Sequence, residues 1–211
     1  MQDFWYGDKL DLIKWGVLFR LAECFEAGRI LQIAFNPRTM KFGRLAIDGE
    51  DRDVPPEVIA HFRNLRKIGS ISSKTQVTVF DPMFQERASH LKAVLAFLSV
   101  FRQERCIVFL DPDTGLEPPK QTQKKQGQKL EWVLRSEARS IWDEMKAGDV
   151  FAFYQHKNNM AGKPWIEPKQ SQLAEALGVI TPAVKIASAL SNQPEVVIFY
   201  AQRTDPVMPH R

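Results

Sequence analysis

Two aspartates stand close together in the segment Asp111-Pro112-Asp113-Thr114-Gly115, directly after the apolar run 106–110. A carboxylate can accept a proton, orient an amino group or bind a hard cation. Pro112 fixes one φ angle and removes one amide, and Gly115 permits a left-handed turn, so a stiff loop would hold both carboxylates. Asp111 and Asp113 are therefore the first candidates for catalytic residues. A turn without function stays open as the alternative, because Asp and Gly are common turn residues.

A second polar strand end holds Gln155 and His156. The carboxyl ends of neighbouring parallel strands meet at one edge of a sheet, which is where open α/β folds bind their ligands. Consecutive strand–helix–strand units usually place their strands side by side. We therefore expect Asp111, Asp113, Gln155 and His156 to converge on one cleft. His156 is a candidate for proton transfer there, and a hydrogen-bonded structural histidine is the alternative.

The same loop offers oxygen ligands for a metal ion. Asp111, Asp113 and Glu117, with His156 as a further ligand, would suit Mg²⁺ or Mn²⁺, since hard cations prefer oxygen. Lys120 would then steady a phosphate, and the chain would be a metal-dependent nuclease or phosphodiester hydrolase. No spacing of Cys and His residues indicates zinc.

Strands and helices alternate along the chain that positions these residues. Apolar spacing predicts helices over 10–25, 55–65, 85–102, 130–145 and 170–177, and strands over 30–35, 45–47, 76–80, 106–110, 150–154, 183–190 and 195–201. The polar turn 48–51 and the polar loop 111–129 carry no helix or strand pattern, and we expect about 112–129 to be flexible. This order predicts an α/β fold, a Rossmann-like three-layer αβα sandwich with a mostly parallel sheet closed by an antiparallel C-terminal hairpin.

The composition is that of an ordinary globular protein, and 211 residues with 44% hydrophobic content predict a single domain over 1–211. No secretion signal and no membrane-spanning apolar run is recognisable, so we expect a cytoplasmic protein without a membrane partner. The net charge of +4 is compatible with a nucleic-acid partner, although the lysines of the long loop, including Lys120, favour a solvated face. Cys24 and Cys106 stand among apolar residues, which predicts two buried, reduced thiols.

Three segments, 7–15, 109–117 and 154–156, resemble an uncharacterised family of bacterial and phage proteins with a similar DPDxG loop and a similar YQH strand end. More remotely, the order of elements resembles adenine-specific ribosomal RNA methyltransferases and other Rossmann-type enzymes that depend on S-adenosylmethionine. In those enzymes a helix containing an Asp and a Lys precedes the first strand, and an acidic Asp-Pro-Pro-Tyr loop follows the fourth.

The resemblance implies S-adenosylmethionine as the cofactor and nucleic acid as the partner. It implies that Asp11, Lys14 and Asn36 contact the cofactor and that Asp111 holds the target amino group. Residues around the loop would then contact the substrate, namely Gly115, Glu117, Lys120 and Gln155.

The chain departs from the methyltransferase pattern at two places. Asp113 and Thr114 stand where the motif has a proline and an aromatic residue, and no glycine follows the first strand until Gly43. Three hypotheses therefore stay open. The first is a methyltransferase-like enzyme acting on nucleic acid, in which Asp111 polarises the acceptor and Asp113 or His156 assists proton transfer. The second is the metal-dependent hydrolase, and the third is a non-catalytic binding or partner protein on the same scaffold.

Overall fold

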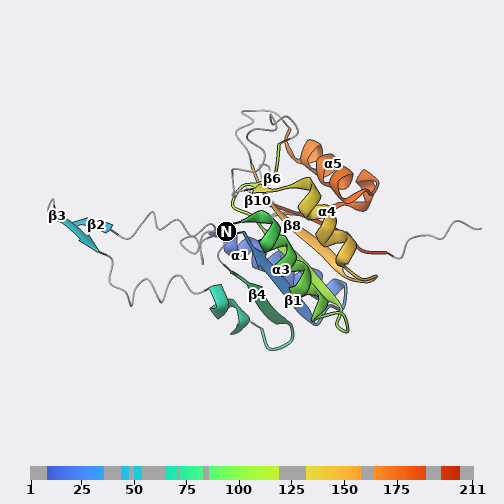
Figure 1. Ribbon diagram of the computed structural model, residues 1–211, viewed down its shortest axis with the longest axis horizontal. Helices are drawn as coiled ribbons and strands as arrows, with labels where there is room; N and C mark the ends of the chain where they lie inside the picture. Colours follow the sequence, from blue (N-terminus) through green and yellow to red (C-terminus); the bar gives the residue numbers. More distant parts are fainter. Residues whose placement is uncertain are drawn as a thin grey trace, which may run out of the picture.

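The computed structural model describes residues 9–35, 44–47, 50–53, 65–70, 72–82, 86–118, 132–157, 164–188 and 196–204. Its centre is a six-stranded sheet with the strand order β4-β1-β5-β8-β10-β9 (Figure 1). The sheet strands are β1 (Arg29–Ala34), β4 (Gln76–Phe80), β5 (Cys106–Asp111), β8 (Val150–His156), β9 (Lys185–Ser188) and β10 (Val196–Gln202). The α-helices are α1 (Lys9–Cys24), α3 (Arg87–Ser99), α4 (Arg135–Glu144) and α5 (Ile166–Leu177).

The strand directions confirm the predicted fold class. β1 pairs in parallel with β4 and with β5, and β5 pairs in parallel with β8. β10 lies between β8 and β9 and is antiparallel to both. β5 and β8 are almost entirely apolar and buried along their length, as expected for parallel strands covered on both faces.

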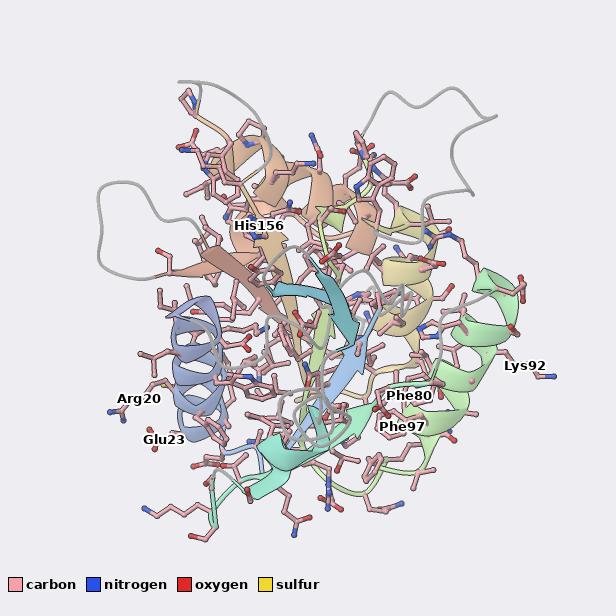
Figure 2. All side chains as sticks on the ribbon, turned by 90° about the vertical axis from the view of Figure 1, so that its left-hand side faces the viewer. Arg20, Glu23, Phe80, Lys92, Phe97 and His156 are labelled. Atoms are coloured by element: carbon pink, nitrogen blue, oxygen red, sulfur yellow. The ribbon has the colours of Figure 1, made fainter. Side chains whose placement is uncertain are left out.

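Helices cover both faces of the sheet. Alternate residues of β5 enter two separate cores: Ile107 and Phe109 pack with Leu18 of α1, whereas Val108 and Leu110 pack with side chains of α3, α4 and α5. In Figure 2, α1 with Arg20 and Glu23 lies to one side of the sheet, and α3 with Lys92 lies to the other. The fold is therefore a mostly parallel sheet between two helical layers.

Several predicted boundaries are wrong. The helix predicted over 85–102 spans only Arg87–Ser99, because the Glu86 side chain accepts hydrogen bonds from two amides of the first turn and so caps it. The helix predicted from residue 130 begins at Arg135, because Trp132–Val133 forms the short strand β7. β7 pairs with β6 (Gly115–Leu116), a strand inside the segment predicted to lack one.

Other predictions fail by smaller margins or lie outside the described residues. Glu50–Asp53 forms β3, which pairs with β2 (Arg44–Ile47), whereas residues 50 and 51 were expected in a turn. α5 begins at Ile166 and ends, as predicted, at Gly178 in the left-handed conformation. The predicted helix 55–65 lies outside the described residues except for Leu65, which starts the 3-10 helix η2 (Leu65–Ser70), and a second 3-10 helix, η3, spans Thr181–Ala183.

The two cysteines are both free thiols, as predicted, but only Cys106 is buried. Cys24 is exposed at the end of α1, one turn beyond the buried Leu21. Among the described helices, none has the length and apolar character needed to cross a membrane.

Candidate functional site

The strand order identifies one point of the carboxyl edge as the expected ligand-binding crevice of this fold. The strand that follows β1 in this sheet, β4, lies on one side of β1, whereas β8, which follows β5, lies on the opposite side of the β1–β5 pair. Open α/β folds bind ligands at such a reversal, between the carboxyl ends of the two strands. Ala34 of β1 and Asp111 of β5 are register partners at this point. The aspartate picked out from the sequence thus lies at the edge where this fold binds ligands.

Four polar side chains meet beside this crevice and form what we call the Lys14 cluster: Asp11, Lys14, Gln32 and Asp111. Lys14 Nζ lies 2.6 Å from Asp11 Oδ1 and 3.3 Å from Asp111 Oδ2. Gln32 Nε2 donates a hydrogen bond of 2.8 Å to Asp111 Oδ2. The exposed fraction is 3% for Lys14 and 0% for Asp111, so the cluster is a buried polar network.

Periodicity explains how these residues meet. Asp11 and Lys14 are three positions apart on α1 and so lie on the same helical face. Gln32 and Asp111 lie on the strand faces that turn toward α1, in step with Ile30 and Phe109 of the core on that side. The fold thus brings Lys14 and Asp111, which are 97 positions apart in the sequence, into contact.

Lys14 remains a cation despite its burial. Burial of the ammonium alone would lower the pKa of Lys14, but the charges of Asp111 and Asp11 and their hydrogen bonds outweigh it, and the net pKa is raised from 10.5. The ammonium also lies 5.2 Å from the centre of the Tyr154 ring, which favours a cation.

Tyr154 links the cluster to His156. Their rings are 5.7 Å apart and nearly perpendicular, at 88°. Alternation along β8 places both side chains on the face that α1 covers. His156 is half-buried at the end of β8 (Figure 2), and no described residue hydrogen-bonds to its imidazole. β5 and β8 are adjacent, as predicted, and they bring Asp111 and His156 to the same edge and the same face of the sheet.

Gln155 points to the opposite face. Its Oε1 accepts from the amide of Leu116 at 3.0 Å, and its Nε2 donates to the carbonyl oxygens of Thr114 at 3.2 Å and His156 at 2.9 Å. The side chain therefore fastens the acidic loop to β8 and does not join Asp111 in one cleft. A Cβ on Gly115 would lie 2.3 Å from Gln155 Nε2, and Gly115 has a φ of 109°, so only glycine fits there.

The proposed metal ligands do not gather. Glu117 is buried, and its Oε1 accepts a hydrogen bond of 2.9 Å from the amide of Arg135, the first residue of α4. Asp111 bonds to Lys14 on the other face of the sheet. Asp113, which lies between Asp111 and Glu117 in the sequence, is half-buried. Within the described ranges, no three His, Cys, Asp or Glu residues lie close enough together to hold a metal ion.

Two of the candidate residues, Asn36 and Lys120, lie outside the described residues. The neighbour of Asn36 is informative, however. Phe35 is buried in the core beneath α3, with its ring 5.3 Å from the ring of His90. The Phe35 side chain is therefore not in the crevice on the face of Lys14.

Sequence reasoning missed Gln32 and Tyr154 as members of the site. Gln32 is a polar residue within the buried strand 29–34, which is a detectable signal because such strands are otherwise apolar. Tyr154 belongs to the YQH strand end of the resemblance but was given no role, because a tyrosine at the end of an apolar strand is common core material.

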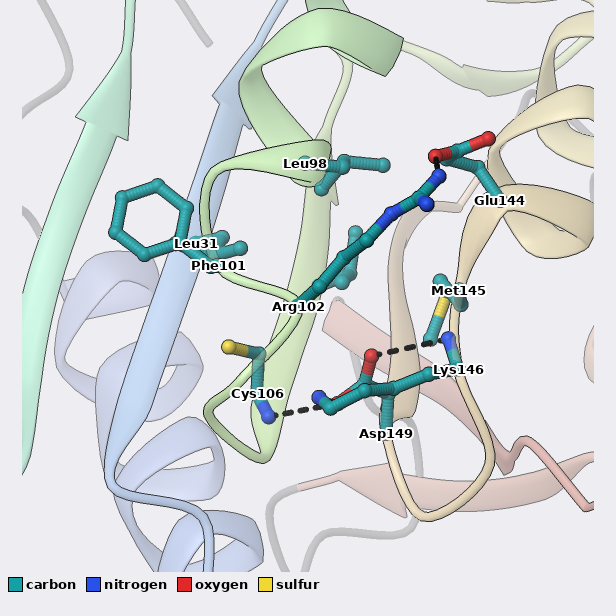
Figure 3. Close-up of a pocket in the computed structure, with 10 residues that line it drawn as sticks. Leu31, Leu98, Phe101, Arg102, Cys106, Glu144, Met145, Lys146 and Asp149 are labelled. Carbon is teal, nitrogen blue, oxygen red and sulfur yellow. Dashed lines mark hydrogen bonds and ion pairs between the residues drawn. The ribbon is translucent and has the colours of Figure 1, made fainter.

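A pocket at the opposite, amino edge of the sheet is too small for a cofactor. It lies between Cys106, Arg102, Glu144 and Asp149 and has room for a water-sized molecule, about 10 Å³ (Figure 3). Burial, first of all, raises the pKa of the Cys106 thiol to about 12, so this thiol stays protonated and unreactive at neutral pH. Neither this pocket nor the Cys106 thiol is therefore a candidate site for a cofactor.

Comparisons with models of known protein families and with curated proteins found no match to this chain.

Proposed function

We propose that the chain binds S-adenosylmethionine in the crevice between the carboxyl ends of β1 and β5 and methylates an amino group of a nucleic acid. One observation carries the proposal. The Lys14 cluster gathers Asp11 and Lys14 from α1 with Asp111 from β5 at the point where the strand order reverses. The remote resemblance implies this combination: an Asp- and Lys-bearing helix before the first strand and an acidic loop after the fourth.

The topology gives further support. β9 and β10 form an antiparallel pair at one end of the sheet, and the methyltransferase sheets that the chain resembles are also closed by an antiparallel hairpin. Strand order alone is weak evidence for function, because the same fold serves many activities. The strand order supports the proposal because its reversal point, between β1 and β5, lies next to the Lys14 cluster.

The residues present fit a polar, nucleoside-sized ligand on two counts. Gln32 Nε2 is committed to Asp111, and Gln32 Oε1 is buried with no hydrogen-bond donor in the part of the chain that the structure describes. An acceptor in this state favours a ligand that brings a hydroxyl or amino hydrogen. Phe35, the first residue after β1, packs toward α3 and leaves the face of Lys14 clear of its ring.

S-adenosylmethionine supplies a methyl group that leaves its sulfonium sulfur as the carbon–sulfur bond breaks and a carbon–nitrogen bond forms. The residues of the chain would bind the ligand, orient the acceptor amino group and accept the proton that it releases. Asp111 holds Lys14 and Gln32 in place, and Gln32 Oε1 would accept a hydrogen bond from the ligand. Asp113 would orient the acceptor amino group. His156 would accept the proton that the methylated nitrogen releases, because its imidazole is half-exposed and has no hydrogen bond to a described residue.

Calorimetry with S-adenosylmethionine and with S-adenosylhomocysteine tests the proposal. We expect the folded chain to bind both, and Gln32→Leu and Asp111→Asn to weaken binding by about tenfold or more, the effect of one lost buried hydrogen bond. Asp143→Asn is the matched control, since Asp143 is an exposed residue of α4. No heat of binding with a sample shown to be folded by circular dichroism would overturn the proposal.

The second candidate is a non-catalytic binding protein that uses the same crevice. The complete burial of the Asp111 carboxylate, already held by Lys14 and Gln32, favours it, because a catalytic carboxylate must reach its substrate. Transfer of a radioactive methyl group to mixed RNA or DNA separates the two. Binding of the cofactor without any transfer, unchanged by His156→Ala, would support the binding protein.

A further inference from the structure

The Lys14 cluster contains more acidic than basic groups. Among its four members, the two carboxylates of Asp11 and Asp111 face the single ammonium of Lys14, so these members carry one negative charge in excess. Lys14 Nζ lies 2.6 Å from Asp11 Oδ1, but 3.4 Å from Asp111 Oδ1 and 3.3 Å from Asp111 Oδ2. The Lys14 ammonium is therefore closer to Asp11, and the excess negative charge lies on the side of Asp111.

The side-chain oxygen of Gln32 lies on that same side. Gln32 is fully buried, and its Nε2 donates to Asp111 Oδ2 at 2.8 Å, whereas its Oε1 accepts no hydrogen bond from any described residue. The orientation of the amide is fixed, because the reverse orientation would turn an acceptor oxygen toward the carboxylate. Since Nε2 and Oε1 are bonded to the same carbon, Oε1 lies beside the acidic side of the cluster. A buried acceptor in this state favours a donor supplied by a ligand.

The charge and the acceptor together select one kind of donor. A ligand hydroxyl or a neutral amino group can donate to Gln32 Oε1, but neither brings a charge. A primary ammonium donates hydrogen bonds and also brings the positive charge that balances the side of Asp111. Burial of charge without such balance is costly, so the cationic donor is favoured. A carboxylate or a phosphate is disfavoured at this position, because it would face both the Gln32 oxygen and the Asp111 carboxylate.

We propose that Gln32 Oε1, beside Asp111, selects a ligand that carries a primary ammonium. The inference rests on the proposed function, in which the ligand is S-adenosylmethionine and the ammonium is the amino group of its methionine end. The methionine end would then lie against the Lys14 cluster between α1 and β1, and the adenosine would lie farther from it. Gln32 thereby determines which ligand binds and takes no part in methyl transfer itself.

The alternative donor to Gln32 Oε1 is a neutral group of the adenosine, either a ribose hydroxyl or the adenine amino group. The two arrangements differ in the part of the ligand that Gln32 contacts. If Gln32 contacts the adenosine, its substitution weakens every adenosine-containing ligand alike. If Gln32 contacts the ammonium, only ligands that carry the ammonium lose affinity.

Calorimetry with two matched nucleosides isolates the ammonium. Decarboxylated S-adenosylhomocysteine has the adenosine, the thioether sulfur and a terminal ammonium, whereas methylthioadenosine has the same adenosine and sulfur with only a methyl group beyond them. We expect the wild-type chain to bind the first about tenfold or more tightly than the second, the effect of one hydrogen bond to a charged group. Gln32→Leu should weaken binding of decarboxylated S-adenosylhomocysteine and leave that of methylthioadenosine nearly unchanged. Asp143→Asn, at an exposed position of α4, is the matched control and should keep the wild-type difference.

Circular dichroism shows whether the substituted chain folds, and Gln32→Met, which is closer in length, replaces Gln32→Leu if it does not. Equal affinity of the wild type for the two nucleosides, or a difference that survives substitution of Gln32, would overturn the inference and leave binding of S-adenosylmethionine intact. Equal weakening of both nucleosides would assign Gln32 Oε1 to the adenosine and would also overturn it. If no nucleoside binds, S-adenosylmethionine included, this inference and the proposed function fail together.

Discussion

At the scale of single residues, the distinctive feature is the buried ammonium of Lys14, which contacts the carboxylates of Asp11 and Asp111. A buried ion pair of this kind adds little to stability by itself, but removal of one partner leaves a charge without compensation. Without Lys14, Asp11 and Asp111 would both lose the buried cation that lies 2.6 Å and 3.3 Å from their carboxylate oxygens. The cluster therefore fixes the start of α1 against the end of β5, which keeps the edge of the crevice in one arrangement.

The pH dependence of stability reports on Lys14. Its pKa is raised above the ordinary 10.5, so its contribution to stability is complete below pH 10.5 and is lost as the pH rises through the higher folded value. Lys14→Met should be less stable than the wild type by about 3–5 kcal/mol at pH 8, the range for a broken buried pair. Urea unfolding between pH 8 and the alkaline limit measures both the loss and its pH range.

The difference between the two chains should shrink as the pH rises above 10.5, because deprotonated Lys14 no longer compensates the carboxylates. Lys92→Met is the control and should follow the wild-type curve at every pH. Parallel curves for Lys14→Met and the wild type throughout this range would show that Lys14 carries no such charge coupling.

At the scale of elements, the side-chain amide of Gln155 holds the loop that follows β5. Gln155 bonds on both sides of Gly115, to Thr114 and Leu116, and this holds the short strand β6 beside β7. The contact needs the absence of a Cβ at Gly115.

Gly115→Ala and Gly16→Ala should change stability in opposite directions. Alanine at position 115 would adopt a positive φ and contact the Gln155 amide, at a cost of about 1–3 kcal/mol. Gly16 lies within α1 with open space around it, so alanine there should add about 0.5–1 kcal/mol through helix propensity. Urea unfolding compares the two chains, and equal effects of the same sign would contradict the role given to Gln155.

The strands were predictable, but the contacts between distant residues were not. Runs such as 106–110 and 150–154 are apolar enough to be recognised as buried parallel strands without any structure. β6 and β7 are two residues long, and their pairing depends on the Gln155 amide, which no local pattern encodes. Asp111 was singled out by its place after a buried strand and Lys14 through a resemblance, and no periodicity predicts that their side chains meet. Gln32 was visible as a polar interruption of a strand and was overlooked.

At the scale of the whole molecule, the two edges of the sheet differ in the side chains and contacts that they hold. The carboxyl edge holds the Lys14 cluster and His156, whereas the amino edge is fixed by structural contacts such as that of the Cys106 amide with Asp149 Oδ1 at 2.9 Å. Open α/β folds keep ligand chemistry at one edge because loops and helix amino ends gather there. We therefore expect a bound ligand to stabilise the carboxyl edge of the sheet more than the amino edge.

Hydrogen–deuterium exchange with and without S-adenosylmethionine tests this asymmetry. A bound ligand adds stability that grows with the logarithm of one plus the ratio of its concentration to the dissociation constant, and it slows exchange most where it touches the chain. We expect the strongest added protection at the start of α1 and in 111–118, and much less around 104–106 and 146–149 at the amino edge. Asp111→Asn should reduce the protection at α1 and 111–118 together, because the Lys14 cluster joins them. Protection that spreads evenly over both edges would mean that the ligand stabilises the fold without occupying the crevice.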